Sequence, residues 1–399
     1  MVLNKHSQLE SKSLSNKTLE YLTFYTYGIN EFVKSNTLPL EYYVMGIEFE
    51  EWKIEDSLAI IKMLMFHVTY DWTFEALRDH LYKSIKNTQI IDQMLPFLDK
   101  DMSMFNKDFS IDQFADLDLN SSDLNDNDIS FNIKSIIKDK RMKFQGTSSV
   151  WAINGNNTKS GKPLFSVNTH FGLGVPSVMH PSELIYGDKF VVGFTIPGTP
   201  IYITGRNKNI TWSPSSVEYD ISWAYKEKIR NGTYLRNGSW VPLKIDYETI
   251  MIKDSENYAL EVVSTDHGPL LKHIKNYSWE WLPNIDSGHS LFSNTNTSIV
   301  SAFIDIQHYN SIKKFIKDHE HINFSALSLI LSDNIGKNGN IGYISFWDNI
   351  YKNFTNLHKI GYELGWEYPY YNDFRLHQSK TDRFILNPES GFICSTNNR

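Results

Sequence analysis

A serine and a histidine bracket a short segment whose residue types could carry nucleophilic chemistry. Ser148 begins an aliphatic and aromatic run, and His170 follows a second such run at Leu164 to Val167. The residues between the two runs are rich in Asn, Ser, Gly and Pro, which favour turns. This pattern predicts a β-hairpin that brings a hydroxyl near an imidazole. Such a pair could be a nucleophile and its orienting group, although serine and histidine at strand ends also serve as caps or face solvent.

The hairpin belongs to an ordered series of motifs. The blocks in the C-terminal part are Ser148-Ser149-Val150-Trp151, Ser160 to Leu164, Asn168 to Gly172, Ile196 to Pro200, Gly205 to Asn207 with Ile210 to Trp212, Thr265 to Pro269, Asn338 to Tyr343, and Asn387 to Asn398. In this order they resemble the β subunit of the penicillin acylase family, which are N-terminal nucleophile hydrolases. Gly28 to Asn30, Leu38 to Glu41 and Trp52 to Ala59 resemble the α subunit of the same family.

The resemblance implies an α+β fold, the αββα sandwich of the Ntn hydrolases, in which two sheets lie between helical layers. It also implies three regions. Residues 1–97 would be a helical region like the α subunit, and residues 98–147 an acidic, Asn-rich linker that ends at a self-cleavage site. Residues 148–399 would be the region like the β subunit. Family members extend further at both ends, so we expect the fold to be incomplete here.

Hydrophobic periodicity predicts individual elements. It indicates an amphipathic helix from Thr18, a break at Leu38 to Tyr42, and a second helix that opens in Glu51 to Ala59. Residues 1–14 are polar, and we expect them to be frayed. Runs typical of strands and of one further helix are Phe190 to Phe194, Ile201 to Thr204, Glu248 to Ile252, Tyr258 to Val263, Leu327 to Leu331, and the helix near Ile312 to Ile316.

In the family, the precursor cuts itself at the bond before the nucleophile. The resemblance places that bond between Thr147 and Ser148. The hydroxyl of Ser148 would attack the carbonyl of Thr147, and hydrolysis of the resulting ester would free the α-amine of Ser148. An α-amine titrates at about pH 7.7 to 8.0, so its neutral form can act as the general base for amide hydrolysis.

Three further residues receive roles from the resemblance. His170 would hydrogen-bond the nucleophile, with a purely structural histidine as the alternative. The backbone N–H of Ser216 would be one oxyanion donor. The second donor in the family is an Asn side chain, and Ser328 occupies its place here. This departure weakens the predicted oxyanion hole. Asn323 could replace Ser328 only if the alignment shifts.

The calcium site that many members carry is also weakened. Asp220 matches one ligand, but Trp223 replaces another, so a hard cation loses a charged oxygen. Glu227 matches a family Glu, and we interpret it as a surface carboxylate rather than a ligand. We therefore expect no metal and no cofactor.

Composition limits the partners. The net charge is −7 over 399 residues with both signs interspersed, which gives no basic surface for nucleic acid. No apolar run is long enough to span a bilayer, and the polar start lacks the apolar core of a signal peptide, so we expect a cytoplasmic location by default. The single cysteine, Cys394, excludes an internal disulfide and is interpreted as a core residue.

The sequence therefore predicts a self-processing amidohydrolase that acts on a linear or cyclic amide as an α/β heterodimer cut from one precursor. Penicillins, acyl-homoserine lactones and other amides all remain open as substrates. The alternative is an inactive or truncated member that keeps a pocket for binding. Because family segments at both ends are missing from this sequence, separate chains could supply them. Alone, the chain is expected to associate or to dissolve poorly.

Overall fold

A computed structural model describes the parts of the chain that position the candidate residues. The described residues are 3–69, 81, 85, 90, 148–171, 174–216, 222–270, 277–281, 299–320, 322, 327–346, 350–352, 363–364, 374–376 and 384–395. The predicted linker at 98–147 lies outside them. None of the described helices is long and apolar enough to cross a membrane.

The N-terminal region is helical: α1 spans Leu3–Ser11, α2 Asn16–Ser35, α3 Leu40–Met45 and α4 Ile54–Thr69. The two predicted helices are confirmed, but the predicted break at Leu38 to Tyr42 is confirmed only in part, because α2 ends at Ser35 and α3 already begins at Leu40. The expectation of a frayed start is wrong, because α1 packs against α4. There the Nζ of Lys62 lies 2.7 Å from a carboxylate oxygen of Glu10, and both side chains are largely shielded from solvent.

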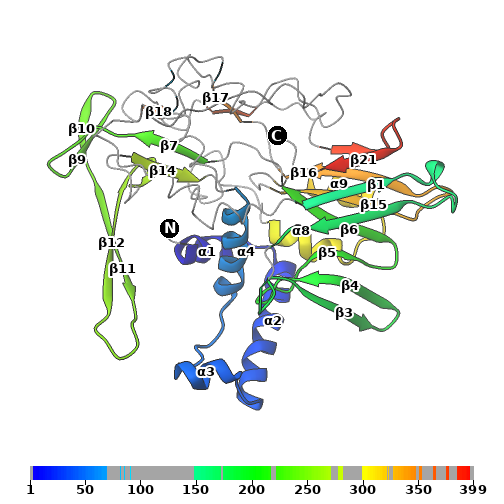
Figure 1. The fold of residues 1–399 in the computed structure, drawn as a ribbon, viewed down its shortest axis with the longest axis horizontal. Coiled ribbons are helices and arrows are strands. Elements are labelled where there is room, and N and C mark those ends of the chain that lie inside the picture. The colour runs from blue at the N-terminus through cyan, green and yellow to red at the C-terminus, as the bar shows by residue number, and fades with distance from the viewer. Residues whose placement is uncertain are drawn as a thin grey trace.

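The central element is a seven-stranded antiparallel sheet with the order β20-β16-β15-β6-β5-β4-β3 (Figure 1). Its strands are β3 His180–Tyr186, β4 Lys189–Thr195, β5 Tyr202–Arg206, β6 Ile210–Ser216, β15 Leu327–Asp333, β16 Asn340–Ser345 and β20 Phe384–Leu386. The strands predicted near 190, 201 and 327 are therefore confirmed. All seven residues of β15 are buried, because both faces of this strand are covered.

A second, three-stranded sheet lies over β6 and β15. Its order is β2-β1-β21, with β1 at Ser148–Ile153, β2 at Leu164–Thr169 and β21 at Phe392–Ser395. Side chains alternate along a strand. Val150 and Ala152 of β1 therefore point inward and form a core with Ile330, Ile341, Tyr343 and Ile393.

The same alternation corrects the interpretation of Cys394 as a core residue. Ile393 and Ser395 of β21 are buried, whereas Cys394 between them is exposed on the outer face of the sheet. Trp151 and Phe392 share that outer face and are also exposed.

Helices cover the other face of the seven-stranded sheet. Helix α8 spans Ile299–Ile306 and α9 spans Ile312–His319, as predicted near 312, and they contact β5, β15 and β16. The large core there joins Phe303 and Phe315 of these helices to Trp212 of β6 and to Leu22 of α2. The described part of the chain is thus a mixed helix-and-sheet structure, in which two sheets are stacked and helices cover the larger one.

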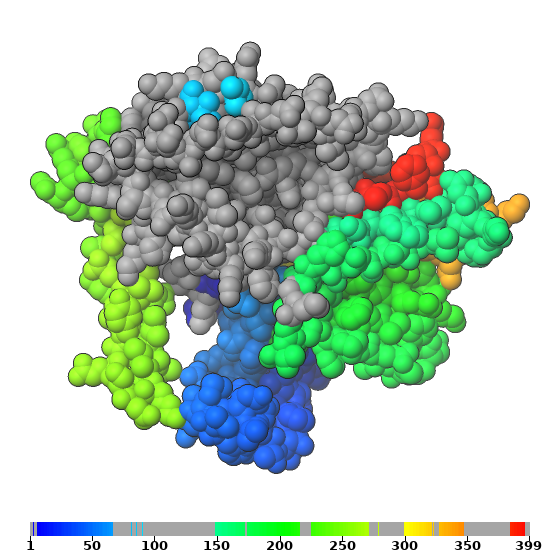
Figure 2. Space-filling model, in the orientation of Figure 1, coloured from blue at the N-terminus to red at the C-terminus, as the bar shows by residue number. Residues whose placement is uncertain are grey.

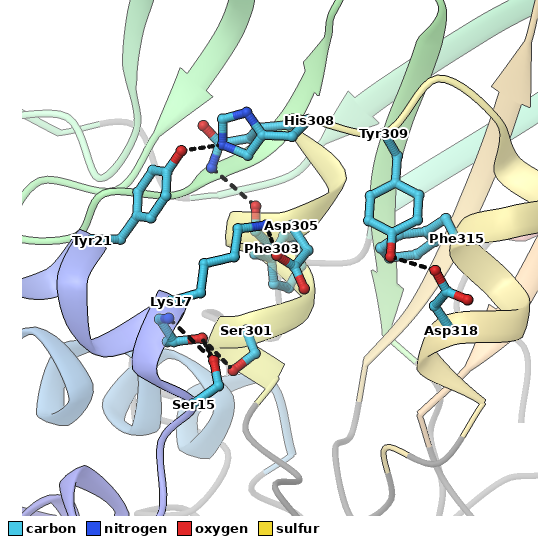
Figure 3. Close-up of polar contacts among 12 residues, drawn as sticks. Ser15, Lys17, Tyr21, Ser301, Phe303, Asp305, His308, Tyr309, Phe315 and Asp318 are labelled. Carbon is cyan, nitrogen blue, oxygen red and sulfur yellow. Dashed lines mark hydrogen bonds and ion pairs between the residues drawn. The ribbon is translucent and has the colours of Figure 1, made fainter.

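Polar contacts, which we call the polar seam, join α2 to α8 and to the residues that follow α8 (Figure 3). Lys17 pairs with Asp305, and the phenol of Tyr21 is hydrogen-bonded to Nε2 of His308. The hydroxyl of Thr18 lies 2.8 Å from that of Ser301. The N-terminal region therefore contacts residues far downstream of Ser148 by both apolar and polar contacts.

The remaining strands form smaller sheets. One sheet contains β7 Ser222–Lys226, β14 Tyr277–Trp281 and β18 Glu363–Leu364, and another contains β8 Ile229–Arg230, β9 Thr233–Arg236 and β10 Ser239–Pro242. A third contains β11 Lys244–Ile250, β12 Tyr258–Thr265 and β13 Gly268–Pro269. Strands β17 Ile350–Lys352 and β19 Phe374–Leu376 form a two-stranded sheet. Hairpin β11–β12 is a long arm, as Figures 1 and 2 show. At its tip, Nζ of Lys253 donates to the carbonyl of Met45 at the end of α3.

Candidate active site

Ser148 is the first residue of β1, and the predicted hairpin is confirmed. In the pairing of β1 with β2, Ser148 lies opposite Thr169, and His170 follows at once. His170 is exposed. The turn between the strands holds a short 3-10 helix, Gly155–Asn157, whose N-cap is Asn154. The fold therefore places the hydroxyl-bearing residue and the imidazole-bearing residue at the same end of one hairpin.

The strand alternation of β1 gives the direction of Ser148. Ser148 shares a face with Val150 and Ala152, both of which are fully buried against the seven-stranded sheet. Ser149 lies on the opposite face, with the half-exposed Trp151. Ser148 therefore lies on the face of β1 that looks toward β6 and β15.

The two oxyanion candidates lie on those strands. Ser216 is the last residue of β6 and lies opposite Leu327 of β15. Ser328 is the next residue of β15 and lies opposite Ser215. The fold thus places the backbone of Ser216 beside Ser328, as the resemblance implies. Their part in binding an oxyanion stays a prediction.

The hydroxyl of Ser328 is already engaged. It is fully buried, and its Oγ donates to the backbone carbonyl of Ser215 over 3.0 Å. An oxyanion would have to compete with that carbonyl for the single O–H that a serine offers. Asn323, the substitute considered from the sequence, lies outside the described residues.

Two hydroxyl pairs line the face of β6 between the sheets. The Oγ of Ser215 lies 2.6 Å from the Oγ of Ser395 in β21, which joins the two sheets. The Oγ of Ser213 lies 2.9 Å from the Oγ1 of Thr204 in the neighbouring strand β5. We did not predict Ser395 or Ser215 as site residues. The alternation of Phe392 to Ser395 could have placed Ser395 inward, but nothing in the sequence pairs it with Ser215.

Hydrogen bonds near the opposite end of β1 involve Asn154, which follows the strand, and Asn387 and Asn340 from two of the sequence blocks. The amide N–H of Asn154 donates to the carbonyl of Gly391 over 2.8 Å. The side chain of Asn387 accepts from the N–H of Ile341 over 3.0 Å and donates to the Oδ1 of Asn340 over 2.8 Å. Asn387 has a positive φ of 49°, which Asn tolerates better than most residues. These bonds explain why the two blocks carry Asn at these positions.

The interpretation of Glu227 as a surface carboxylate is wrong. Glu227 follows β7 and is 2% exposed. Its Oε1 accepts hydrogen bonds from Ser278 over 2.7 Å and from Thr265 over 3.0 Å, and it lies 2.8 Å from Nδ1 of His267. A carboxylate is stable in a buried position only where donors of this kind compensate for lost hydration. Thr265 and His267 belong to the block Thr265 to Pro269 that the sequence singled out.

The structure describes the residues that match the family's calcium ligands only in part, so the expectation of no metal stays a prediction. Asp220 lies outside the described residues, and the indole of a tryptophan at 223 has no oxygen to offer. Glu227 is engaged by three donors through one oxygen. Among the described residues, no group of three or more His, Cys, Asp and Glu side chains could hold a metal ion. We derive no chemical step through a metal.

Comparison with known proteins gives one consistent family. The family profile described as penicillin amidase matches residues 2–399. The chain is 25% identical over 405 residues to the acyl-homoserine lactone acylase QuiP of Pseudomonas syringae pv. syringae, an alignment that covers 95% of this chain and 45% of the relative. It is 22% identical over 275 residues to the penicillin acylase 2 proenzyme of Pseudomonas sp. strain SE83, covering 67% of this chain and 35% of the relative.

Among solved structures, the chain is similar to a thermostable penicillin G acylase from Alcaligenes faecalis. The TM-score is 0.49 at 18% identity, and the match covers 63% of this chain and 44% of the other. The chain thus spans about half the length of the relatives that it matches over its whole length.

Proposed function

Because the chain belongs to the penicillin amidase family and its relatives include amide-hydrolysing acylases, we propose that it hydrolyses an amide with Ser148 as an N-terminal nucleophile. The observation that carries the proposal is the place of Ser148 as the first residue of β1, on the face toward the ends of β6 and β15. A nucleophile at that point lies on the same side of its sheet as the backbone of Ser216. The αββα sandwich belongs to the same proposal, supported by the stacking of the two sheets and by the helices α8 and α9.

Maturation begins with attack of the Oγ of Ser148 on the carbonyl carbon of Thr147. The C–N bond of that peptide breaks, the nitrogen takes up a proton as the α-amine, and an ester joins the Thr147 carbonyl to Oγ. Water then hydrolyses the ester and leaves a carboxylate on Thr147 and a free hydroxyl on Ser148. The pieces 1–147 and 148–399 remain associated through the core and the polar seam of α2 with α8.

Amide hydrolysis uses the same hydroxyl. The neutral α-amine of Ser148 accepts the proton of Oγ while Oγ attacks the substrate carbonyl, and the backbone N–H of Ser216 donates to the developing oxyanion. Collapse transfers the proton to the leaving amine and gives an acyl-enzyme, which water hydrolyses. His170, next to the residue opposite Ser148, would orient the nucleophile.

The relatives direct the choice of substrate. Those that match over 95% or more of this chain carry the name acyl-homoserine lactone acylase. We propose an N-acyl amide with an apolar acyl chain as the substrate class and acyl-homoserine lactones as the first compounds to test. Phenylacetyl amides are the natural comparison, because penicillin acylases are among the relatives.

A second candidate function is binding without turnover. One observation favours it: the hydroxyl of Ser328 donates to the carbonyl of Ser215, so the second oxyanion donor is engaged elsewhere. In that case the chain would bind the amide but hydrolyse it slowly.

Intact mass analysis of the expressed chain tests the proposal. We expect two pieces that meet between Thr147 and Ser148. Ser148→Ala should remain one piece. Ser149→Ala is the matched control, because it removes the neighbouring hydroxyl from the outer face of the same strand, and it should still be cut. A cut that persists in Ser148→Ala, or that maps to another bond, would contradict the assignment of the nucleophile.

A further inference from the structure

The two sheets are linked by a direct hydroxyl contact near the candidate nucleophile. The Oγ atoms of Ser215 in β6 and Ser395 in β21 lie 2.6 Å apart, and each residue is only about 1% exposed. Ser395 lies opposite Val150 in the pairing of β21 with β1. The contact therefore joins the immediate neighbour of β1 to the strand beneath it.

The position of this link relative to the site is specific. Ser148 precedes Val150 by two residues on β1, and Ser216 follows Ser215 directly on β6. On one side of the link, Ser395 pairs with Val150, which is two residues from the nucleophile. On the other side, Ser215 is next to Ser216, the backbone oxyanion donor. The hydrogen bonds of Asn154 with Gly391 and Asn387 lie at the opposite end of β1.

Apolar packing alone would hold the two sheets less accurately. The contacts of Val150 and Ala152 with Ile330 and Ile341 are non-directional, so they do not by themselves fix the direction of a polar group. A hydrogen bond between buried hydroxyls fixes both a distance and a direction. Removing one partner also leaves the other hydroxyl buried with one bond fewer.

We propose that Ser395 is a positioning residue for the chemistry of Ser148. Its hydroxyl, bonded to that of Ser215, sets the offset between the sheet that carries the nucleophile and the sheet that carries the backbone donor at Ser216. Ser395 does not touch the reacting atoms, and it acts through β21 and β1. The inference rests on the proposed function, because it assigns a role relative to Ser148.

The structure supplies a matched control. Ser213 lies two residues before Ser215 on the same face of β6, is fully buried, and forms a hydroxyl pair of 2.9 Å with Thr204. That pair joins two strands of one sheet and does not cross between the sheets. Ser213→Ala therefore removes a buried hydroxyl bond of the same kind without loosening the sheet that carries the nucleophile.

The test compares Ser395→Ala with Ser213→Ala in three measurements: the rate of cleavage at Thr147–Ser148, kcat and KM for an acyl-homoserine lactone, and the melting temperature. We expect similar decreases in melting temperature for both variants. Only Ser395→Ala should slow cleavage and lower kcat, by about ten- to a hundredfold, with KM nearly constant, since small displacements of a nucleophile have effects of this size. Ser395→Thr keeps a hydroxyl and should restore most of the rate.

The outcomes separate the two proposals. If the parent chain is not cut at Thr147–Ser148 and shows no hydrolysis that depends on Ser148, the proposed function fails and the positioning role fails with it. If the parent chain is active and Ser395→Ala loses no more activity than Ser213→Ala, the positioning role alone is overturned. Should Ser395→Ala not fold, Ser395→Cys keeps the shape of the side chain with a larger atom and a weaker donor, and it should show the same selective loss of kcat.

Discussion

Nδ1 of His267 lies 2.8 Å from Oε1 of Glu227 in a place that water does not reach, and the imidazole stacks on the ring of Tyr225 at 4.0 Å. The same oxygen accepts the hydroxyls of Thr265 and Ser278. These residues come from the end of β7, the end of β12, the turn after it, and β14. One carboxylate oxygen therefore ties the β11–β12 arm to the sheet that contains β7 and β14.

This arrangement predicts that Glu227→Ala destabilises the chain severely. The substitution would leave the buried imidazole and two hydroxyls without their shared acceptor, and each buried donor left without a partner costs about 1–3 kcal/mol. Glu261→Ala is the control, because Glu261 is an exposed carboxylate of β12 that accepts a bond from Tyr247. For Glu261→Ala we expect the free energy of unfolding to change by no more than about 0.5 kcal/mol. Urea unfolding of both variants measures the difference, and equal stabilities would show that Glu227 is not the structural centre of this cluster.

A second prediction concerns pH. Burial lowers the pKa of His308, and the charges of Lys17 and Lys189 lower it further, while Asp305 opposes them. Since the unfolded imidazole binds a proton more readily than the folded one, His308 contributes stability that is complete above the ordinary value of 6.5. This stability is lost as the pH falls through the folded pKa.

Asp305 acts in the same direction at lower pH. Its burial works to raise the pKa of the carboxyl, but the hydrogen bonds from His319 and Lys17 outweigh burial and lower it. Its contribution is complete above the ordinary value of 3.8 and is lost as the pH falls through the folded pKa. The polar seam of α2 should therefore weaken in acid, first through His308 and then through Asp305.

The measurement is the melting temperature between pH 7.5 and 5, or the fraction of the N-terminal piece that stays bound after cleavage. His308→Gln should flatten the pH dependence in this range. Lys34→Ala, which removes an exposed pair with Glu31 on the same helix, should leave it as in the parent chain. A parent chain whose stability is constant from pH 7.5 to 5 would contradict the prediction.

Two glycines should respond in opposite directions to alanine. A Cβ at Gly193 would lie 2.1 Å from the carbonyl oxygen of Thr204 and 2.6 Å from the Cα of Gly205, both backbone atoms that cannot move aside. A Cβ at Gly28, within α2, meets nothing within 4 Å. Gly193→Ala should therefore unfold or strongly destabilise the seven-stranded sheet. Gly28→Ala should stabilise the chain by about 0.5–1 kcal/mol, because alanine favours a helix. Thermal unfolding of both variants decides, and a destabilised Gly28→Ala would indicate an unseen contact on that helix face.

Local patterns predicted the elements well where hydrophobic residues recur at a regular spacing or form a continuous run. The β1–β2 hairpin, α2, α4 and β15 follow from hydrophobic spacing and from turn residues. The start of the chain was predicted wrongly, because α1 is stabilised by α4 through contacts such as Glu10 with Lys62, and no local pattern contains them. Cys394 and Glu227 were misplaced for related reasons. The position of Cys394 depends on the register of β21 against β1, and that of Glu227 on three partners that are distant from it in sequence.

The motifs indicated Ser148, His170, Ser216 and Ser328 as site residues, and their roles stay predictions. The strand register places Ser148 on the face toward the other sheet. The contacts of the hydroxyls could not be predicted. Whether Ser328 donates to a carbonyl, and whether Ser395 meets Ser215, depends on the separation and the offset of two sheets.

The last prediction concerns the oxyanion hole at Ser328. The resemblance implies an Asn side chain at this place, and the hydroxyl of Ser328 donates to the carbonyl of Ser215. Ser328→Asn would supply a longer side chain with two N–H donors, of which one can satisfy that carbonyl and the other can reach the oxyanion. One added donor is worth roughly 3 kcal/mol in the transition state, so we expect kcat for amide hydrolysis to rise by about a hundredfold. Ser332→Asn makes the same change on the same face of β15, four residues further along, and should give no increase. Steady-state kinetics on correctly cut protein measures both variants. If Ser328→Asn folds and is cut as the parent chain is, yet hydrolyses the amide no faster, Ser328 is not the position of the second donor.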